Sequence, residues 1–454
     1  MCESLLSVGL DVGTTTTQMI VSKLAVENRA SAFSVPKMEI VDREILYRGQ
    51  VRFTPLLGED LVDAPELGQM IRSEYELAGI AREDVDTGAV IITGETSRKE
   101  NAKAVLEQIS DLAGEFVVAT AGPDLESVLA AKGAGAVQFS EDSGKRVLHM
   151  DIGGGTTNLA LIEDGRILRT GCLNVGGRLV KLGENGKITY VSPVLKGISS
   201  LKVGDKPEKR ELEKLAKTLA RVLEGAAGWG EEPLLGKLVT REARPWQAPE
   251  GVQVISFSGG VADCIAREIP WLSFGDLGPL LGQAIRESRL CAGEYRLGTE
   301  TIRATVIGAG CHATSLSGST VFCRNVTLPM KNLPVMCITR AEQESAELPQ
   351  ILKNRLETGE TVMIAMPGPE NASYGQLEEL GNRLAKGLEG HPVYLCLEAD
   401  MAKALGQILA LRLGLDVPIL CIDRLKLEPE SYLDVGTPVG PAFPVVIKTL
   451  ILSQ

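Results

Sequence analysis

Two short segments of this chain, far apart in the sequence, share nearly the same chemistry. They are Gly9–Thr17, which reads GLDVGTTTT, and Met150–Asn158, which reads MDIGGGTTN. In each segment an apolar run ends at an aspartate and continues into a turn of glycines and threonines. Asp11 and Asp151 are 140 residues apart (151 − 11), an interval longer than the repeats of solenoid proteins. The spacing therefore predicts an internal duplication and a two-lobed protein.

Both turns suit a phosphate ligand. A glycine turn exposes successive backbone N–H groups, and threonine hydroxyls add further donors for an oxyanion. The candidate phosphate-binding residues are Gly13, Thr14, Thr15, Gly153, Gly154, Gly155 and Thr156. Asp11 and Asp151, at the strand ends, would hold a hydrated Mg²⁺ between the phosphates and the protein. The alternative interpretation is a pair of ordinary hairpin turns with no ligand.

A third glycine turn follows later in the chain, within Val254–Val261. Here an apolar strand runs into Ser258-Gly259-Gly260 and then into a helix. Glycine lets a flat base and its ribose lie against bare backbone, so Gly259 and Gly260 are candidates for nucleoside binding. A tight strand-to-helix turn without a ligand is the alternative. The three turns account for part of a glycine surplus, 49 in 454 residues against an average of ~7%.

Apolar patterning predicts an α/β protein in three parts. Strands are expected at Leu6–Asp11, Gln18–Leu24, Lys37–Tyr47, Gln50–Leu56, Ala89–Thr93, Glu115–Ala119, Arg146–Met150, Asn158–Glu163, Arg166–Thr170, Val252–Phe257 and Arg303–Ile307. Helices are expected at Pro65–Ala78, Arg98–Ala113, Pro123–Lys132 and Glu208–Glu224. We expect a first lobe over 1–145, a second lobe over 146–320 and a C-terminal α/β segment over 321–454. That segment alternates strands and helices as parallel sheets do, and would either bind a target or complete the second lobe.

Composition excludes several classes of function. The net charge of −12, without a block of Lys or Arg, disfavours nucleic-acid and anionic-membrane binding. No apolar run approaches the ~18 residues of a membrane span, and the start lacks the basic and apolar regions of a signal peptide. The nine cysteines show no CxxC spacing, which disfavours zinc sites and a disulfide framework. A cytoplasmic location is the expectation, and His149 and the pair Cys311-His312 are expected to pack rather than to react.

The three turns, taken in order, resemble the phosphate-1, phosphate-2 and adenosine motifs of the actin/Hsp70/sugar-kinase ATPase superfamily. This resemblance spans about residues 5–320 and implies a two-lobed, ribonuclease-H-like fold with a duplicated mixed sheet. Within the superfamily the whole chain resembles the family of ethanolamine ammonia-lyase reactivating factors. The segments that carry this narrower likeness are Gly9–Thr17, Asp151–Asn158, Arg303–Gly310, Asp434–Pro438 and Pro444–Leu450.

The resemblance implies an ATP- and Mg²⁺-dependent chaperone, in which the catalytic residues Asp11 and Asp151 would position Mg²⁺ and the attacking water. Such a factor releases damaged cobalamin from ethanolamine ammonia-lyase so that intact adenosylcobalamin can enter. The lyase is then the partner, and cobalamin is handled on the lyase, since this chain lacks the Asp-x-His-x-x-Gly pattern of base-off cobalamin proteins. A homo-oligomer and association with a bacterial microcompartment are further expectations.

Two other functions remain open at the level of sequence. A small-molecule kinase of the same fold would need a general base beside its acceptor hydroxyl, and no candidate other than Asp11 and Asp151 is visible. An actin-like filament or scaffold protein would also share the fold. The end of the chain, Leu450–Gln454, has no basic amphipathic stretch, which disfavours a membrane-tethered relative.

Overall fold

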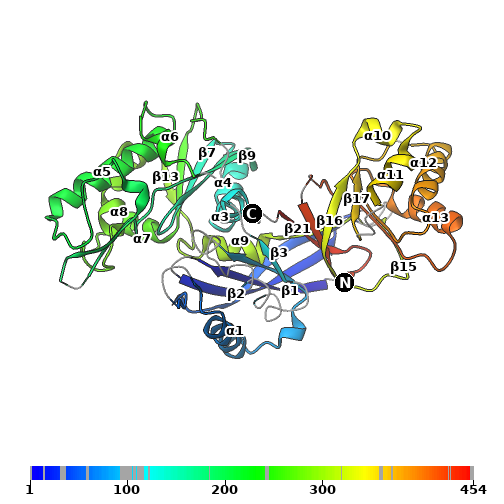
Figure 1. Cartoon of the computed structure of the whole chain (residues 1–454), viewed down its shortest axis with the longest axis horizontal. Coiled ribbons are helices and arrows are strands. Elements are labelled where there is room, and N and C mark those ends of the chain that lie inside the picture. Colours follow the sequence, from blue (N-terminus) through cyan, green and yellow to red (C-terminus); the bar gives the residue numbers. More distant parts are fainter. Residues whose placement is uncertain are drawn as a thin grey trace.

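The computed structural model describes most of the chain. The residues described are 3–13, 16–30, 37–57, 61–92, 105, 109, 117–120, 123–183, 185–240, 245–318, 320–356, 361–369, 372–427, 429 and 431–449. They form three bodies: a first lobe at the bottom of Figure 1, a second lobe at the left and a C-terminal α/β body at the right. Within the described residues, no helix is both long and apolar enough to cross a bilayer.

Two sheets with the same strand order form the cores of the lobes. The first contains β1 (Glu3–Val12), β2 (Thr16–Asn28), β3 (Met38–Arg48), β5 (Thr87–Ile92) and β6 (Val117–Thr120), in the order β3-β2-β1-β5-β6; the short β4 (Arg52–Phe53) pairs with β2. The second contains β7 (Val147–Ile152), β8 (Thr157–Glu163), β9 (Arg166–Leu173), β12 (Val254–Ser258) and β13 (Tyr295–Leu297), in the order β9-β8-β7-β12-β13. In both sheets the first two pairings are antiparallel and the last two are parallel. The predicted duplication is thereby confirmed.

The two lobes exchange helices. α3 (Pro123–Gly133) and α4 (Ala136–Ser143) follow the first sheet in sequence but pack against β7, β8 and β9 of the second. α9 (Ala304–His312) follows the second sheet but packs against β1, β2 and β5 of the first. The helices α3 and α9 also contact each other closely, because a Cβ on Gly308 would lie 2.1 Å from the carbonyl oxygen of Leu129. The lobe boundaries near 145 and 320 stay predictions.

The strand predicted at Arg303–Ile307 is wrong, since these residues begin α9. Every residue of the helix from Ala304 to Cys311 is buried, because α9 is enclosed between the first sheet and α3. A helix that is apolar on all sides loses its 3.6-residue pattern and cannot be told from a buried strand by periodicity. The helical conformation of this segment therefore depends on its tertiary surroundings and could not be predicted from the local sequence.

The structure confirms some of the other elements predicted for the lobes and shortens one of them. Helices α1 (Ala64–Ala78) and α5 (Lys209–Ala226) confirm two predictions, and the apolar face of α5 packs into the core of the second lobe with α7 (Gly260–Ala266) and α8 (Gly278–Arg286). The strand expected over Gln50–Leu56 is reduced to β4. Nearly all of the helix expected at Arg98–Ala113 lies outside the described residues. Between α5 and β12 the structure has a one-turn helix, α6 (Leu235–Leu238).

The C-terminal body is built on one large mixed sheet of order β14-β21-β20-β16-β17-β18-β19-β15. Its centre is parallel and consists of β16 (Met330–Cys337), β17 (Met363–Met366), β18 (Val393–Leu397) and β19 (Ile419–Asp423), alternating with α10 (Arg340–Glu344) and α11 (Leu348–Leu356), then α12 (Tyr374–Gly387), then α13 (Ala402–Leu413). This confirms the parallel α/β prediction. The antiparallel flanks, which no motif indicated, are β14 (Thr314–Leu316), β15 (Phe322–Arg324), β20 (Ser431–Val435) and β21 (Pro444–Thr449).

The C-terminal body adjoins the first lobe rather than completing the second. β14 packs beside β3, and β21 packs beside β6. The hydroxyls of Thr87 in β5 and Thr314 in β14 are hydrogen-bonded at 2.7 Å. Of the two possibilities left open by the sequence, completion of the second lobe is therefore not what the structure shows.

Candidate functional site

The two Asp-Gly-Thr turns have the same backbone geometry. The N–H of Gly13 donates to the carbonyl of Thr16 at 2.9 Å, and the N–H of Gly153 donates to the carbonyl of Thr156 at 2.9 Å. In the adjoining ladders Asp11 pairs with Gln18, while Asp151 pairs with Asn158. The described residues of the two turns thus occupy equivalent positions. Thr14 and Thr15, two of the predicted phosphate ligands, lie outside the described residues.

The second turn presents backbone donors toward open space. Two carbonyl groups of this turn accept hydrogen bonds from the segment 177–178. Gly177 N–H donates to Gly153 O at 3.0 Å, and Arg178 N–H donates to Gly154 O at 2.6 Å. Within the described part of the chain, the N–H groups of Gly154 and Gly155 have no acceptor. A Cβ added to Gly155 would meet nothing within 4 Å. Two free donors on a fixed turn are a suitable site for an oxyanion.

The third turn lies against the second. Gly259, at the start of α7, has φ +83°, and a Cβ there would lie 2.4 Å from the carbonyl oxygen of Ile152. Only glycine allows this approach, which brings the ends of β12 and β7 together. A Cβ on Gly260 would meet no atom within 4 Å, so that position faces space open to a ligand. The structure therefore brings the second and third predicted turns together.

One carboxylate that the sequence did not indicate links the two aspartates. Glu126 projects from α3, and burial together with the negative charges of Asp11 and Asp151 raises the pKa of its side chain well above the usual value. A hydrogen bond with Asn158 acts in the opposite direction. Part of Glu126 stays accessible to solvent. Because the charges of both aspartates act on it, the Glu126 side chain is near the ends of both β1 and β7.

Asp151 is held in a dry, hydrogen-bonded environment. Its carboxylate accepts hydrogen bonds from the hydroxyl of Ser258, directly opposite in β12, and from Thr305 Oγ1 of α9 at 3.5 Å. Burial raises the pKa of Asp151 to about 6, and these two hydrogen bonds oppose the rise. The carboxylate therefore exchanges its proton close to neutral pH.

His149 supports Asp151 through Ser258. Its ring nitrogens are hydrogen-bonded to the hydroxyls of Ser256 and Ser258, each at 3.0 Å, and the side chain is fully buried. Burial lowers the pKa of His149 to about 3, so the ring is neutral. The histidine packs, as expected, and it fixes the serine that donates to Asp151. Cys311 is buried in α9, where its sulfur is 3.1 Å from the hydroxyl of Ser22.

Oxygen donors at this site suit a hydrated magnesium ion. The side-chain oxygens Oε1 of Gln18 and Oδ1 of Asn158 are buried and have no hydrogen-bond partner, although buried polar atoms nearly always have one. They occupy equivalent positions beside Asp11 and Asp151. Among the described residues no group of three or more His, Cys, Asp or Glu side chains could ligate a metal directly. The donor set thus fits an ion that keeps its water shell, as Mg²⁺ commonly does.

Several side chains cross from one lobe to the other around this site. Gln18 Nε2 donates to the carbonyl of Ile302 at 3.1 Å. The guanidinium of Arg178, paired with Asp276 at 3.3 Å, lies 5.8 Å from the centre of the Phe53 ring. These contacts join the first and second lobes near the ends of β1 and β7.

Sequence reasoning missed several residues of this site. Glu126 and Thr305 come from the exchanged helices, so no local spacing connects them to the aspartates. Gln18 and Asn158 could have been found, because each follows its aspartate by seven residues across a hairpin.

The fold and site together define a two-lobed ATPase fold of the actin/Hsp70 type. The duplicated sheets, the paired aspartate turns and the exchanged helices between the lobes are its defining features here. The chain belongs to the family described as ethanolamine utilisation protein EutA, which matches residues 3–453.

Two full-length relatives support this assignment. The chain is 38% identical over 469 residues to the ethanolamine ammonia-lyase reactivase EutA of Salmonella typhimurium (strain LT2), with 98% of each protein covered. It is 37% identical over 467 residues to the protein of the same name from Escherichia coli (strain K12), again with 98% of each covered. The predicted family is therefore confirmed.

More distant similarities are found among solved structures. The PPX-GPPA enzyme of Aquifex aeolicus is 12% identical, with a TM-score of 0.42, and the match covers 67% of this chain and 99% of that one. The ethanolamine utilization protein EutJ of Carboxydothermus hydrogenoformans is 17% identical, with a TM-score of 0.34, and the match covers 67% and 89%. The family assignment depends on the full-length relatives.

Proposed function

We propose that this chain is an ATP-dependent reactivating chaperone for ethanolamine ammonia-lyase. The observation that carries the proposal is its full-length similarity to two proteins named as reactivases of that lyase. In this proposal the chain promotes release of damaged cobalamin from the lyase, and intact adenosylcobalamin then binds. Cobalamin is handled on the lyase and is not bound by this chain, which binds ATP and later ADP.

In this proposal each of the three turns binds a different part of the nucleotide. Gly13, Thr14 and Thr15 of the first lobe, and Gly153–Thr156 of the second, would hold the phosphates from two sides through N–H and hydroxyl donors. Gly259 and Gly260 would lie against the adenosine. Asp11 and Asp151 would hold Mg²⁺ through water, with the free oxygens of Gln18 and Asn158 accepting hydrogen bonds from that water. The ion supplies positive charge that offsets the phosphates.

Glu126 is placed to accept the proton of the attacking water. Glu126 projects from α3 near both aspartates and accepts a hydrogen bond from Asn158, which would orient its carboxylate toward a water held at this site. Asp151, hydrogen-bonded by Ser258 and Thr305, orients the water shell instead. The loss of γ-phosphate contacts after hydrolysis would then allow the lobes to separate. That movement is the step that would change the affinity for the lyase.

The proposal is tested by adding the chain, ATP, Mg²⁺ and fresh adenosylcobalamin to inactivated ethanolamine ammonia-lyase. We expect lyase activity to recover with the wild type and with Asp416→Asn, an exposed control in the C-terminal body. Recovery and ATP hydrolysis should both be lost with Asp11→Asn and Asp151→Asn. Full reactivation by both of the latter variants would reject the site, and no recovery with the wild type would reject the function.

The same experiment distinguishes the alternatives. ATP-dependent phosphorylation of a metabolite without lyase recovery would indicate a small-molecule kinase, and reversible sedimentation with ATP would indicate an actin-like filament. Homo-oligomer formation and a place in a bacterial microcompartment are parts of the proposal that sedimentation and localisation experiments would test.

A further inference from the structure

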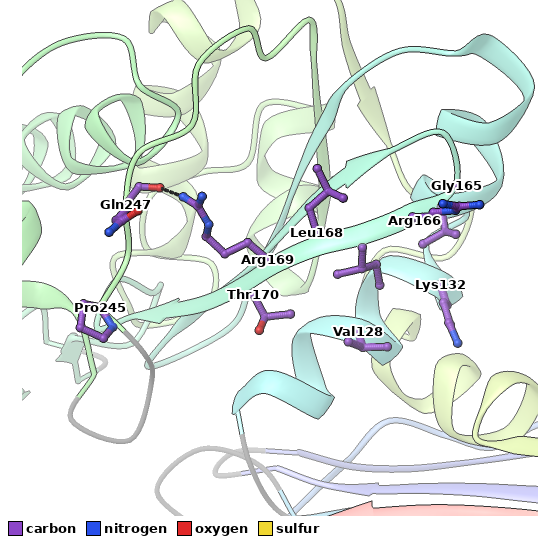
Figure 2. A pocket seen from close by; sticks show the side chains of 11 residues that line it. Val128, Lys132, Gly165, Arg166, Leu168, Arg169, Thr170, Pro245 and Gln247 are labelled. Atoms are coloured by element: carbon purple, nitrogen blue, oxygen red, sulfur yellow. Dashed lines mark hydrogen bonds between the residues drawn. The ribbon is translucent and has the colours of Figure 1, made fainter. Parts of the chain in front are cut away.

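A groove on the second lobe lies away from the turns of the proposed nucleotide site. It has a volume of about 1110 Å³ and is bounded by α3, β9 and the segment around Gln247. Figure 2 shows Lys132 and Arg166 at one end, Pro245 and Gln247 at the other, and Val128 and Leu168 between them. The floor is thus apolar in the middle and cationic at one end.

The charge of this groove is opposite to that of the whole chain. Three of its lining residues are cations, namely Lys132, Arg166 and Arg169, and none of its lining residues is Asp or Glu. The chain as a whole has a net charge of −12. Within the described residues, neither Lys132 nor Arg166 forms an ion pair, and Arg169 donates to the carbonyl of Gln247 at 2.6 Å. Arg166, which is exposed, is therefore available to an anionic ligand, whereas Lys132 is half-buried.

The groove also follows a free strand edge. β9 is the last strand of its sheet, and among the described residues no strand pairs with the outer edge of 166–170, where the pairing with β8 is interrupted by a bulge at Leu168. Immediately beyond, the chain itself uses that edge: Leu173 bridges Val239 in antiparallel fashion, and Thr240 N–H donates to Cys172 O at 3.0 Å. An exposed edge with unpaired backbone groups is a template for another strand. Leu168, 52% exposed, adds an apolar contact beside it.

We propose that this groove binds an extended, acidic segment of a partner protein, which adds as a strand to the free edge of β9. Backbone hydrogen bonds along 166–170 hold the segment, alternate apolar side chains contact Val128 and Leu168, and carboxylates lie near Lys132 and Arg166. A peptide satisfies all three features, whereas a simple anion would use only the cations. Binding of the segment requires no nucleotide.

The test uses the full chain and a fluorescein-labelled peptide, Glu-Val-Glu-Val-Glu-Val, followed by fluorescence anisotropy without ATP. Arg166→Glu reverses one exposed charge in the groove, and Arg210→Glu makes the same change at an exposed position of α5. We expect the affinity to fall about tenfold with Arg166→Glu, and further at higher salt, but not with Arg210→Glu. A peptide with Lys in place of Glu should bind weakly. So should a peptide N-methylated at alternate residues, since it lacks the donors that strand pairing requires.

Several results would overturn the proposal. One is the absence of binding to the wild type; another is equal loss with Arg210→Glu, which would indicate a general charge effect. Equal binding of the N-methylated peptide, or binding of inorganic tripolyphosphate alone, would indicate an anion site without strand pairing. Concentration-dependent dimers that Arg166→Glu abolishes would assign the edge to a second copy of this chain instead.

Discussion

Replacing Asp151 by asparagine should stabilise the second lobe while abolishing the proposed ATP hydrolysis. Asp151 is only 7% exposed, and burial raises the pKa of its carboxyl from 3.8 to about 6. In the absence of Mg²⁺ the hydrogen bonds from Ser258 and Thr305 offset only part of the cost of burying the ionised carboxylate. Asparagine keeps the shape of the side chain and can still accept a hydrogen bond from Ser258, but it does not ionise. The substitution therefore removes the free-energy cost of burying an ionised carboxylate, a cost that the wild type has only above the pKa of Asp151.

The magnitude follows from linkage between proton binding and folding. A folded-state pKa above the unfolded value means that the native protein holds the proton more tightly, so its contribution to stability is complete below pH 3.8. That contribution is lost as the pH rises through about 6. The difference of about two pH units corresponds to about 3 kcal/mol. The free energy of unfolding of Asp151→Asn, relative to wild type, should grow by that amount between about pH 4 and pH 7.

Urea unfolding followed by tryptophan fluorescence measures this effect in the second lobe alone. All three tryptophans, Trp229, Trp246 and Trp271, belong to the second lobe and lie in or against its core. The measurements are made in EDTA at several pH values, with Asp416→Asn as an exposed control. A difference between variant and wild type that stays flat with pH, or a variant that is less stable at pH 7, would refute the reasoning.

The remaining predictions concern one carboxylate and three glycines. Glu126→Gln should lower ATP hydrolysis by ~10²–10⁴-fold while ATP binding persists, as measured with a fluorescent ATP analogue; a change of only a few-fold would exclude it as the general base. Gly260→Ala should weaken ATP binding without changing the melting temperature, because its Cβ meets no protein atom within 4 Å; unchanged affinity would show that no ligand lies there. Gly259→Ala should instead cost at least about 2 kcal/mol of stability, because φ is +83° and the new Cβ would meet Ile152 O. Gly308→Ala should destabilise both lobes, because its Cβ would lie 2.1 Å from Leu129 O; intact thermal stability in calorimetry would contradict this view of the α3–α9 contact.

Much of the fold could be predicted from local signals. The hairpin at Asp164-Gly165 is an example, since both residues have positive φ, as its turn type requires. The alternating strands and helices of 361–423 were also predictable, because fully buried parallel strands read as short apolar runs. By contrast, α9 was read as a strand because both of its faces are covered. Its burial depends on the first sheet, which lies some 300 residues earlier in the sequence.

The candidate site was predictable only where its residues belong to turns. Gly13, Gly153 and Gly259 stand out because the backbone there needs glycine or has a distinctive Gly/Thr pattern. Glu126 has no such local signal, since it is one of two acidic residues in the first turn of α3. It becomes part of the site only because α3 leaves its own lobe. A residue whose role depends on a helix exchanged between domains cannot be found by spacing within either domain.

The helix exchange also explains how a duplicated fold becomes a single responsive site. Glu126 is carried by α3, which packs on the second sheet, yet it is close enough to Asp11 of the first sheet for that charge to raise its pKa. Thr305 is carried by α9, which packs on the first sheet, yet it donates to Asp151 of the second. A change in charge at either aspartate therefore acts on both lobes. Because α3 also forms one wall of the β9 groove, through Val128 and Lys132, a shift of this helix would reach a docked partner as well.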